Sequence, residues 1–205
     1  MLTMKIRKIK VNNFRLLENF EIDLENELSL VIGKNNTGKT SLLAILNKFL
    51  NESRNAFSFD DFNVNLKNHF EKLVSNPITD SYEAQGITLK LFIGYNKEDY
   101  LANISQVMLD LDPENNTVVL AFEYLMNSDK LNLLKEDFDE FKAKESAKKT
   151  EKEGKGEDYD TKGLMFYLRR NHSKYFVYRM KSVLYDKSAK NEKDSVFIDI
   201  GDLKH

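Results

Sequence analysis

The stretch VIGKNNTGKT, residues 31–40, decides how the rest of the chain is interpreted. It contains the pattern G-x-x-x-x-G-K-[ST], with Gly33, Gly38, Lys39 and Thr40 at the defining positions. A string this short recurs by chance, so its meaning depends on a buried strand before it and a helix after it. Without that context, the simplest interpretation is a glycine-containing turn between a strand and a helix.

The residues on either side of the pattern provide this context. Residues 28–33 (LSLVIG) are nearly all apolar, which is typical of a strand buried on both faces. After Lys39, apolar residues recur at helical spacing as far as Leu50. The predicted order of strand, glycine-flanked loop and helix is the order that a phosphate-binding loop requires.

Nucleotide binding is the chemistry that such a loop predicts. Its backbone N–H groups would face the phosphates, and the N-terminus of the following helix would add positive potential. Lys39 would reach the β- and γ-phosphates, Thr40 would ligate Mg²⁺ through its hydroxyl, and Ser41 would contact the α-phosphate side. The cofactor-binding residues expected in this segment are Gly33, Asn35, Asn36, Thr37, Gly38, Lys39, Thr40 and Ser41.

The segment upstream of the loop narrows the family. An NFR element at residues 13–15 precedes GKNNTGKT. Together they resemble the ABC-type ATPase heads of the SMC and RecF group. The resemblance is closest to the OLD-type (overcoming lysogenization defect) ATPase–nucleases, in which G-x-N-N-x-G-K-[ST] is the usual wording. It implies an α/β P-loop NTPase fold with flanking helices and a mixed sheet whose N-terminal strands are antiparallel. It also implies ATP and Mg²⁺ as cofactors.

Four residues outside the loop are further candidates for the site. In the OLD-type family the arginine of NFR lies near the phosphates, so the resemblance implies that Arg15 binds the cofactor. The alternative is a solvated residue at the end of a strand. In ABC-type heads a glutamine on a mobile loop senses the γ-phosphate, and Gln85, Asp60 and Asp61 could serve this purpose. The alternative for these three is that they are plain turn residues.

Hydrophobic periodicity extends the α/β prediction along the chain. Strands are expected at residues 4–11, 20–24, 28–33, 87–94, 117–125, 175–186 and 195–201. Helices are expected from about residue 39 to 50 and at 64–74, 100–111, 129–146 and 163–175. Residues 142–162 are rich in Lys, Glu and Gly with almost no hydrophobes, which predicts a charged flexible insert. The length of 205 residues suits a single P-loop ATPase domain, which we expect to be incomplete at its C-terminus.

The composition excludes several classes of protein. The chain has no cysteine, which removes disulfides, cysteine-ligated zinc and thiol catalysis. Its net charge of -2 does not mark a polycation that binds nucleic acid as a whole, although a local basic patch remains open. The N-terminus has no signal-peptide pattern and no apolar run approaches the length of a membrane span. We therefore expect a cytoplasmic protein that does not contact the membrane.

Several parts of a complete ABC-type head have no counterpart in the sequence. None of the 8 glycines is adjacent to another, so the chain lacks the SGG signature that closes over a partner's ATP. No hydrophobic run ends in Asp-Glu, and VFIDIGD at 196–202 lacks the second carboxylate, which favours an ordinary strand with a polar tip. His69, His172 and His205 are scattered and form no metal-ligand set. We therefore expect no catalytic residue within this chain.

Three functions remain open at this point. The first is the ATP-binding N-terminal portion of a DNA-processing or phage-defence ATP-dependent endonuclease, whose ATP-bound heads form a homodimer or higher oligomer and whose partner is DNA. The second is a stand-alone nucleotide-binding module that regulates a partner without hydrolysis. The third is a small P-loop kinase or GTPase, since NKED at 96–99 matches NKxD by letters. It lacks the DxxG that a GTPase also needs. The pair Arg169–Arg170 is either part of a nucleic-acid surface or a charged outer face.

Overall fold

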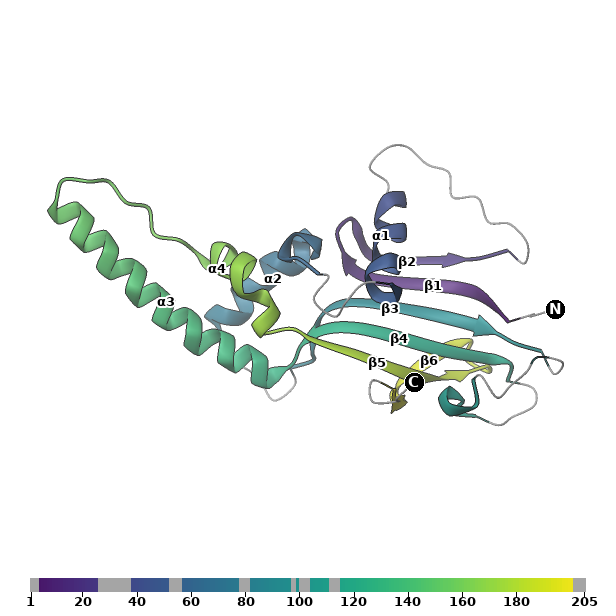
Figure 1. Cartoon of the computed structure of the whole chain (residues 1–205). Coiled ribbons are helices and arrows are strands. Elements are labelled where there is room, and N and C mark those ends of the chain that lie inside the picture. Colours follow the sequence, from purple (N-terminus) through teal and green to yellow (C-terminus); the bar gives the residue numbers. More distant parts are fainter. Residues whose placement is uncertain are drawn as a thin grey trace.

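The structure, a computed structural model, is built on one six-stranded sheet (Figure 1). It describes residues 4–25, 38–51, 57–77, 82–96, 99, 104–110 and 115–200. The strands are β1 (Lys5–Phe14), β2 (Leu17–Asp23), β3 (Gln85–Gly94), β4 (Thr117–Met126), β5 (Val177–Asp186) and β6 (Asn191–Asp199). Their order in the sheet is β2-β1-β3-β4-β5-β6, and each neighbouring pair is antiparallel.

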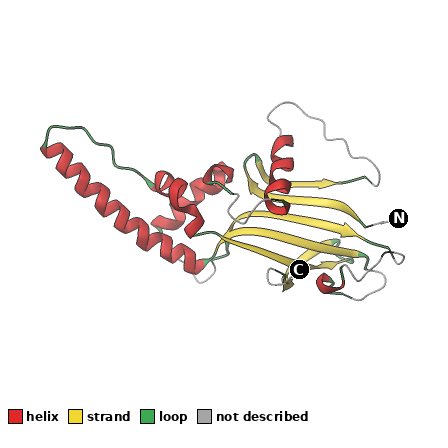
Figure 2. Ribbon diagram, in the orientation of Figure 1, coloured by secondary structure: helices red, strands yellow, loops and turns green. Residues whose placement is uncertain are grey.

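The helices occupy two places relative to the sheet (Figure 2). They are α1 (Lys39–Leu50), α2 (Val64–Ser75), α3 (Ser128–Gly154) and α4 (Leu164–Asn171), with short 3-10 turns η1 (Phe59–Asp61), η3 (Ser105–Val107) and η4 (His172–Lys174). Helices α2, α3 and α4 gather beyond one end of the sheet, whereas α1 lies against one of its faces. The described part of the chain is therefore α/β, as the sequence predicts.

The main core extends from the face of the sheet that α1 covers to the helices beyond the end of the sheet. Alternate residues of β3, including Ile87 and Leu89, point to this face and are fully buried. Phe49 of α1 stands over the central strands, with its ring centroid 5.9 Å from those of Phe122 and Tyr178. Burying side chains of this size stabilises the fold by roughly 1.5–3 kcal/mol each, which is enough to fix α1 on the sheet.

The opposite face of the sheet carries charged residues beside a small apolar cluster of Phe92, Val119, Ala121 and Val183. Lys90 of β3 contacts Asp194 at 2.7 Å and Glu192 at 3.0 Å, although β3 and β6 are not neighbours in the sheet. The start of β6 therefore folds back over this face. Burial raises the pKa of Glu192, but its hydrogen bonds with Lys10 and Lys90 outweigh that effect and lower it to about 2. These pairs let Lys90 and Glu192 stay ionised while largely withdrawn from water.

The sheet differs from the predicted one in strand direction. The sequence predicts a mixed sheet, whereas all pairings between the described strands are antiparallel. The connection from β4 to β5 shows why. Its helices extend beyond one end of the sheet and return to the same end, so β5 starts where β4 stops, with Leu125 opposite Val177. The expected strand at 28–33 lies outside the described residues.

The helix predicted at residues 100–111 is wrong for the part that the structure describes. Residues 104–110 contain a single 3-10 turn, Ser105–Val107, followed by extended chain. Its apolar residues pack against the sheet, where Ile104 belongs to a cluster with Tyr95 and Val118. Ser182 also donates a hydrogen bond to the carbonyl of Val107 at 2.5 Å. These tertiary contacts override the helical periodicity of the segment.

The charged segment 142–162 is partly helical, and its flexibility stays a prediction. Helix α3 continues to Gly154, so the first part of this segment is helical rather than irregular. Pairs at helical spacing support the extension, among them Lys155 with Glu151 at 2.5 Å. Most side chains of the segment are exposed, in keeping with its composition. Beyond the helix, the chain returns along α3, where Glu145 accepts hydrogen bonds from the Tyr159 hydroxyl at 2.8 Å and the Lys162 amide at 3.1 Å.

Candidate nucleotide site

The start of α1 is shaped by a glycine that no other residue could replace without strain. Gly38 immediately precedes the helix, and its carbonyl accepts the Leu42 amide at 2.9 Å. Its φ of +90° lies in the left-handed region that favours glycine. A Cβ at this position would stand 2.6 Å from Cδ2 of Leu17, closer than real Cβ atoms approach. Backbone conformation and packing therefore both require a glycine at the point where the loop meets the helix.

The first turn of α1 presents the residues that the sequence assigns to phosphate and metal. Lys39 is half-buried, Thr40 is exposed and Ser41 is buried. The first amides of a helix point outward along its axis, and the helix dipole adds positive potential at the same place. An exposed hydroxyl at Thr40 has the chemistry of a Mg²⁺ ligand. The predicted helix start is confirmed, whereas cofactor binding by these residues stays a prediction.

Four of the expected cofactor-binding residues precede Gly38 in the sequence. Gly33, Asn35, Asn36 and Thr37 lie outside the described part of the chain. Their assignment to the nucleotide rests on the motif and on the resemblance. The described segment that begins at Gly38 fits that assignment because it supplies the helix N-terminus that such a loop leads into.

Arg15 lies in the turn between β1 and β2 and is held by a carboxylate. Its Nε and Nη2 atoms lie 2.9 Å and 2.8 Å from Oδ1 of Asp61. The side chain remains 39% exposed, and the guanidinium also lies over the ring of Phe14 at 5.0 Å from its centroid. Two residues further on, Leu17 contacts Gly38, so this turn adjoins the start of α1. The role of Arg15 near the phosphates stays a prediction.

Asp61 and Asp60 have structural partners that sequence reasoning did not identify. Asp61 is 2% exposed, and its carboxylate accepts hydrogen bonds from Ser58 and Arg15 and contacts Lys48 at 3.3 Å. Such a buried and saturated carboxylate is not placed to sense a phosphate. Asp60 is exposed and pairs with Arg169 at 2.8 Å. The signal that could have revealed Asp61 is the spacing S-x-x-D from Ser58, which is a capping box in the structure.

Gln85 lies at the same end of the sheet as the Arg15 turn. It is the first residue of β3, and the carbonyl of its neighbour Gly86 accepts a hydrogen bond from Nδ2 of Asn13 at 3.0 Å. Its own Nε2 donates to the carbonyl of Glu83 at 3.2 Å. This location is compatible with a residue near the start of α1, and the sensor role of Gln85 stays a prediction.

The first and last residues of NKED, Asn96 and Asp99, are hydrogen-bonded to each other. The Asp99 carboxylate accepts the backbone amide of Asn96 at 2.7 Å, and the Asp99 amide donates to the Asn96 carbonyl at 3.1 Å. Residues 97 and 98 lie outside the described chain. Asn96 follows the end of β3 opposite to Gln85, so this pair of residues is remote from the Arg15 turn. Nothing in the contacts of Asn96 and Asp99 favours base recognition over a local structural role.

The other candidates have local partners. Nε2 of His172 lies 3.0 Å from the carbonyl of Phe57 in the core, and His69 lies on α2. The guanidinium of Arg170 lies 4.3 Å from the ring centroid of Phe166, and Arg179 pairs with Asp199 of β6 at 2.7 Å. His205 and Asp202 lie outside the described residues. Within the described ranges, no three His, Cys, Asp or Glu residues are grouped so that they could hold a metal ion.

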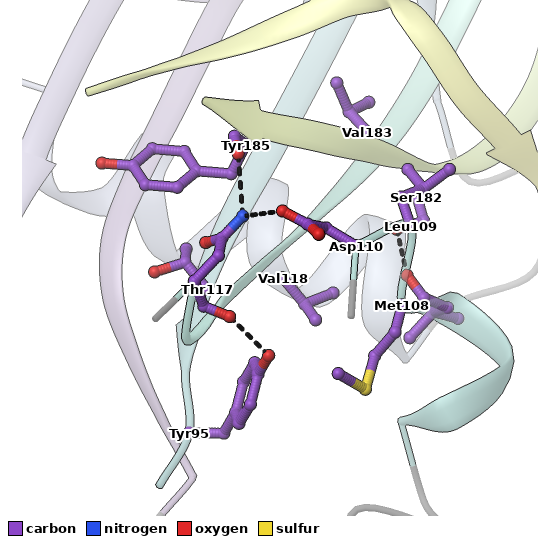
Figure 3. Close-up of a pocket in the computed structure, with 11 residues that line it drawn as sticks. Tyr95, Met108, Leu109, Asp110, Thr117, Val118, Ser182, Val183 and Tyr185 are labelled. Carbon is purple, nitrogen blue, oxygen red and sulfur yellow. Dashed lines mark hydrogen bonds between the residues drawn. The ribbon is translucent and has the colours of Figure 1, made fainter. Parts of the chain in front are cut away.

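A small hollow lies at the end of the sheet remote from the Arg15 turn (Figure 3). Nδ2 of Asn115 donates to Asp110 and to the Tyr185 carbonyl, both at 3.0 Å, while the Tyr95 hydroxyl donates to the Asn115 carbonyl at 2.7 Å. Oδ1 of Asn115 is buried and has no hydrogen-bond partner among the described residues. The cavity measures about 10 Å³, which suits one water molecule and excludes a nucleotide.

A search of the described helices for a membrane span finds none that combines sufficient length with sufficient apolar character.

Comparison with known proteins supplies the family context. The family model described as "AAA ATPase domain" matches residues 4–199. Endonuclease GajA from Bacillus cereus (strain HuB5-5) is 27% identical over 123 residues, which cover 55% of this chain and 18% of that protein. DNA replication and repair protein RecF from Francisella tularensis subsp. mediasiatica (strain FSC147) is 26% identical over 132 residues, which cover 64% of this chain and 36% of that protein. The matches thus span about a third or less of either relative. They support the resemblance to the OLD-type and RecF groups.

Proposed function

Because the chain belongs to the AAA ATPase domain family, we propose that it binds ATP and Mg²⁺ at the N-terminus of α1. The single observation that carries this proposal is Gly38, the glycine of the motif whose left-handed backbone leads directly into the first turn of α1. Lys39 and Thr40 then follow in the order that phosphate and Mg²⁺ recognition requires. Membership of the ATPase family indicates that the ligand is ATP. The N-terminus of α1 is a suitable binding site for its phosphates.

Each residue of the proposed site at the start of α1 has its own role in binding. The Lys39 ammonium supplies a charge-assisted hydrogen bond to phosphate oxygens, and the Thr40 hydroxyl supplies one oxygen ligand to the metal. Backbone amides from Gly33 to Ser41 complete the anion site, in which Asn35, Asn36 and Thr37 shape the loop. Arg15 adds a second positive charge from the β1–β2 turn. Mg²⁺ held there by Thr40 would offset the negative charge of the phosphates.

The wider function that we propose is that of an ABC-type, OLD-like ATPase that acts in DNA processing or phage defence. The names of two relatives, an endonuclease and a DNA replication and repair protein, support a role in DNA metabolism. In this proposal the chain is the N-terminal portion of a cytoplasmic ATP-dependent endonuclease. Its ATP-bound heads form a homodimer or higher oligomer, and DNA is its partner. The hydrolytic carboxylates and the SGG signature come from elsewhere in the assembly.

The test of the nucleotide site is the affinity of the purified chain for ATP–Mg²⁺, measured by calorimetry. Lys39→Ala removes a charge-assisted contact worth about 1.5–3 kcal/mol, so affinity should fall at least about tenfold. Lys72, exposed on α2, supplies the matched control, and Lys72→Ala should bind as the unaltered chain does. Equal affinity of the Lys39→Ala variant would show that the nucleotide binds elsewhere or not at all.

A further inference from the structure

The carboxylate of Asp61 joins three separate segments of the chain. Its Oδ1 receives two nitrogens of Arg15, from the β1–β2 turn, at 2.9 Å and 2.8 Å. Its Oδ2 receives the amide and hydroxyl of Ser58 at 2.9 Å and 3.1 Å and lies 3.3 Å from Nζ of Lys48 on α1. The side chain is 3% exposed, so these contacts are shielded from water. A shielded carboxylate between two cations is a strong constraint on their positions.

The backbone around Arg15 is held by the same segment. Its φ is +51°, a left-handed value that costs free energy for a residue other than glycine. The Arg15 amide donates to the Asp61 carbonyl at 2.8 Å, and the Arg15 carbonyl accepts Nδ2 of Asn63 at 2.7 Å. Phe14 and Phe62 form a bridge beside these bonds. Residues 61–63 thus fix both the backbone and the side chain of Arg15.

The contacts between Arg15 and residues 61–63 are connected to both ends of α1. Near the start of the helix, Leu17 of the same turn fills the space beside Gly38. Near the end, Lys48 reaches the Asp61 carboxylate. The guanidinium meets Asp61 through Nε and Nη2, which is a side-on approach, and the side chain keeps 39% of its surface exposed. Arg15 is therefore oriented by one edge while a further part of it faces solvent.

From these contacts we propose that Asp61 is a positioning residue for the nucleotide site, acting through Arg15. The proposal rests on the proposed function, because Arg15 has a ligand to meet only if ATP binds at α1. Asp61 sets the direction of the guanidinium and the spacing between the β1–β2 turn and the helix. It does not touch the nucleotide itself. Burial raises the pKa of Asp61, but hydrogen bonds from Ser58 and Arg15 together with the charge of Lys48 lower it overall, so the carboxylate stays charged for this task.

The neighbouring carboxylate supplies a matched control. Asp60 has the same chemistry and lies next to Asp61 in the chain, but it is 63% exposed and pairs with Arg169 of α4. Asp60→Asn should therefore leave the affinity for ATP–Mg²⁺ within about twofold of the unaltered chain. Asp61→Asn, which removes the charge and keeps the shape, should weaken binding about threefold or more, the lower end of coupling between groups in contact.

A double-mutant cycle separates positioning from general loosening of the fold. Arg15→Ala should weaken ATP binding, and adding Asp61→Asn to it should produce no further loss, because Asp61 acts through the missing guanidinium. An equal loss from Asp61→Asn in both backgrounds would overturn the proposal, as would full affinity of the Asp61→Asn variant. If Asp61→Asn does not fold, Ser58→Ala takes its place in the cycle. It keeps both charges and removes only the hydroxyl contact, and an unchanged affinity would then count against the proposal.

The Lys39→Ala variant keeps the two hypotheses apart. If Lys39→Ala binds ATP as the unaltered chain does, the nucleotide site itself is misplaced. If Lys39→Ala loses affinity while Asp61→Asn and Arg15→Ala act independently, the site stands and only the positioning role fails.

Discussion

Leu17 occupies the volume that any side chain at position 38 would need: its Cδ2 atom lies 2.6 Å from the place of a Cβ on Gly38. The turn between β1 and β2 therefore packs directly on the residue that opens α1. The glycine of the motif thus contributes to tertiary packing as well as to the backbone conformation of the loop.

This contact makes Gly38→Ala costly. The variant must adopt a left-handed φ with a side chain and must also displace Leu17, so we expect a loss of about 1–3 kcal/mol in the free energy of unfolding. Urea unfolding followed by circular dichroism measures it. The control is Gly154, the last residue of α3, where a Cβ would meet no atom within 4 Å. Gly154→Ala should be neutral or stabilise by up to about 1 kcal/mol. Equal effects of the two substitutions would contradict the packing argument.

Steady-state ATP hydrolysis by the isolated chain should be close to background even though ATP binds. Binding needs the loop, Lys39 and Thr40, whereas hydrolysis needs a positioned water and groups that stabilise charge on the γ-phosphoryl. A phosphate-release assay provides the measurement. Turnover near about 1 s⁻¹ that disappears in Lys39→Ala would show a complete active site within this chain. The stand-alone regulatory module predicts that added C-terminal sequence does not restore turnover, whereas the ATPase-portion proposal predicts that it does.

The charged face of the sheet should make stability depend on pH. The pKa of Glu192 in the folded protein is lowered to about 2 from its ordinary value of 4.5. A lowered folded pKa means that the contribution is fully present above the unfolded pKa. It is then lost as the pH falls through the folded value. Glu192→Gln should therefore reduce stability at neutral pH and flatten its decline between about pH 4.5 and 2. Thermal unfolding at several pH values measures this, and Glu71→Gln, on the exposed side of α2, is the control.

Glu145 should keep residues 155–162, which return along α3, packed against that helix. It accepts hydrogen bonds from Lys148, Tyr159 and the Lys162 amide, which lower its pKa to about 2. Glu145→Gln replaces the carboxylate with a weaker acceptor, so local opening should become more frequent and trypsin should cleave after Lys155 and Lys162 faster.

The control for this experiment is Glu140→Gln. Glu140 is 74% exposed and meets Lys144 only at 3.8 Å, so its loss should leave the cleavage rate unchanged. Equal acceleration in both variants would show that the net charge of α3, and not the contact of Glu145, controls the segment.

Local patterns predicted most of the described secondary structure, and long-range contacts account for the failures. Alternation predicted a strand at 87–94 and the structure has β3 at Gln85–Gly94, because one face of that strand is buried under α1. The helix prediction for residues 104–110 is wrong because the apolar residues of this segment pack in a small cluster with Tyr95 and Val118. The charged composition of residues 142–154 predicts irregular chain, but Lys, Glu and Ala are good helix formers, so α3 continues to Gly154.

The candidate site also combines features that local sequence predicts with features that depend on long-range contacts. The start of the helix at Lys39 follows from spacing and residue type, which are local properties. The pair formed by Arg15 and Asp61 joins residues 46 positions apart, so it depends on how η1 packs against the β1–β2 turn. Only the spacing of Ser58 and Asp61 was visible in the sequence, and it indicates a cap rather than a partner for arginine.

The helical excursion between β4 and β5 leaves and re-enters the sheet at residues that face each other, Leu125 and Val177. For protein engineering, the part of this connection that lies farthest from the sheet can therefore be replaced. The sheet fixes where the two ends of the excursion lie, but places no limit on how far it extends, and longer connections cost little additional closure entropy. The base must be retained, because Leu131, Leu134 and Leu168 belong to the core. Beyond that base, the tip of α3 can be shortened, lengthened or fused to another domain. Such a change should not shift the strand register of the sheet against which α1 packs.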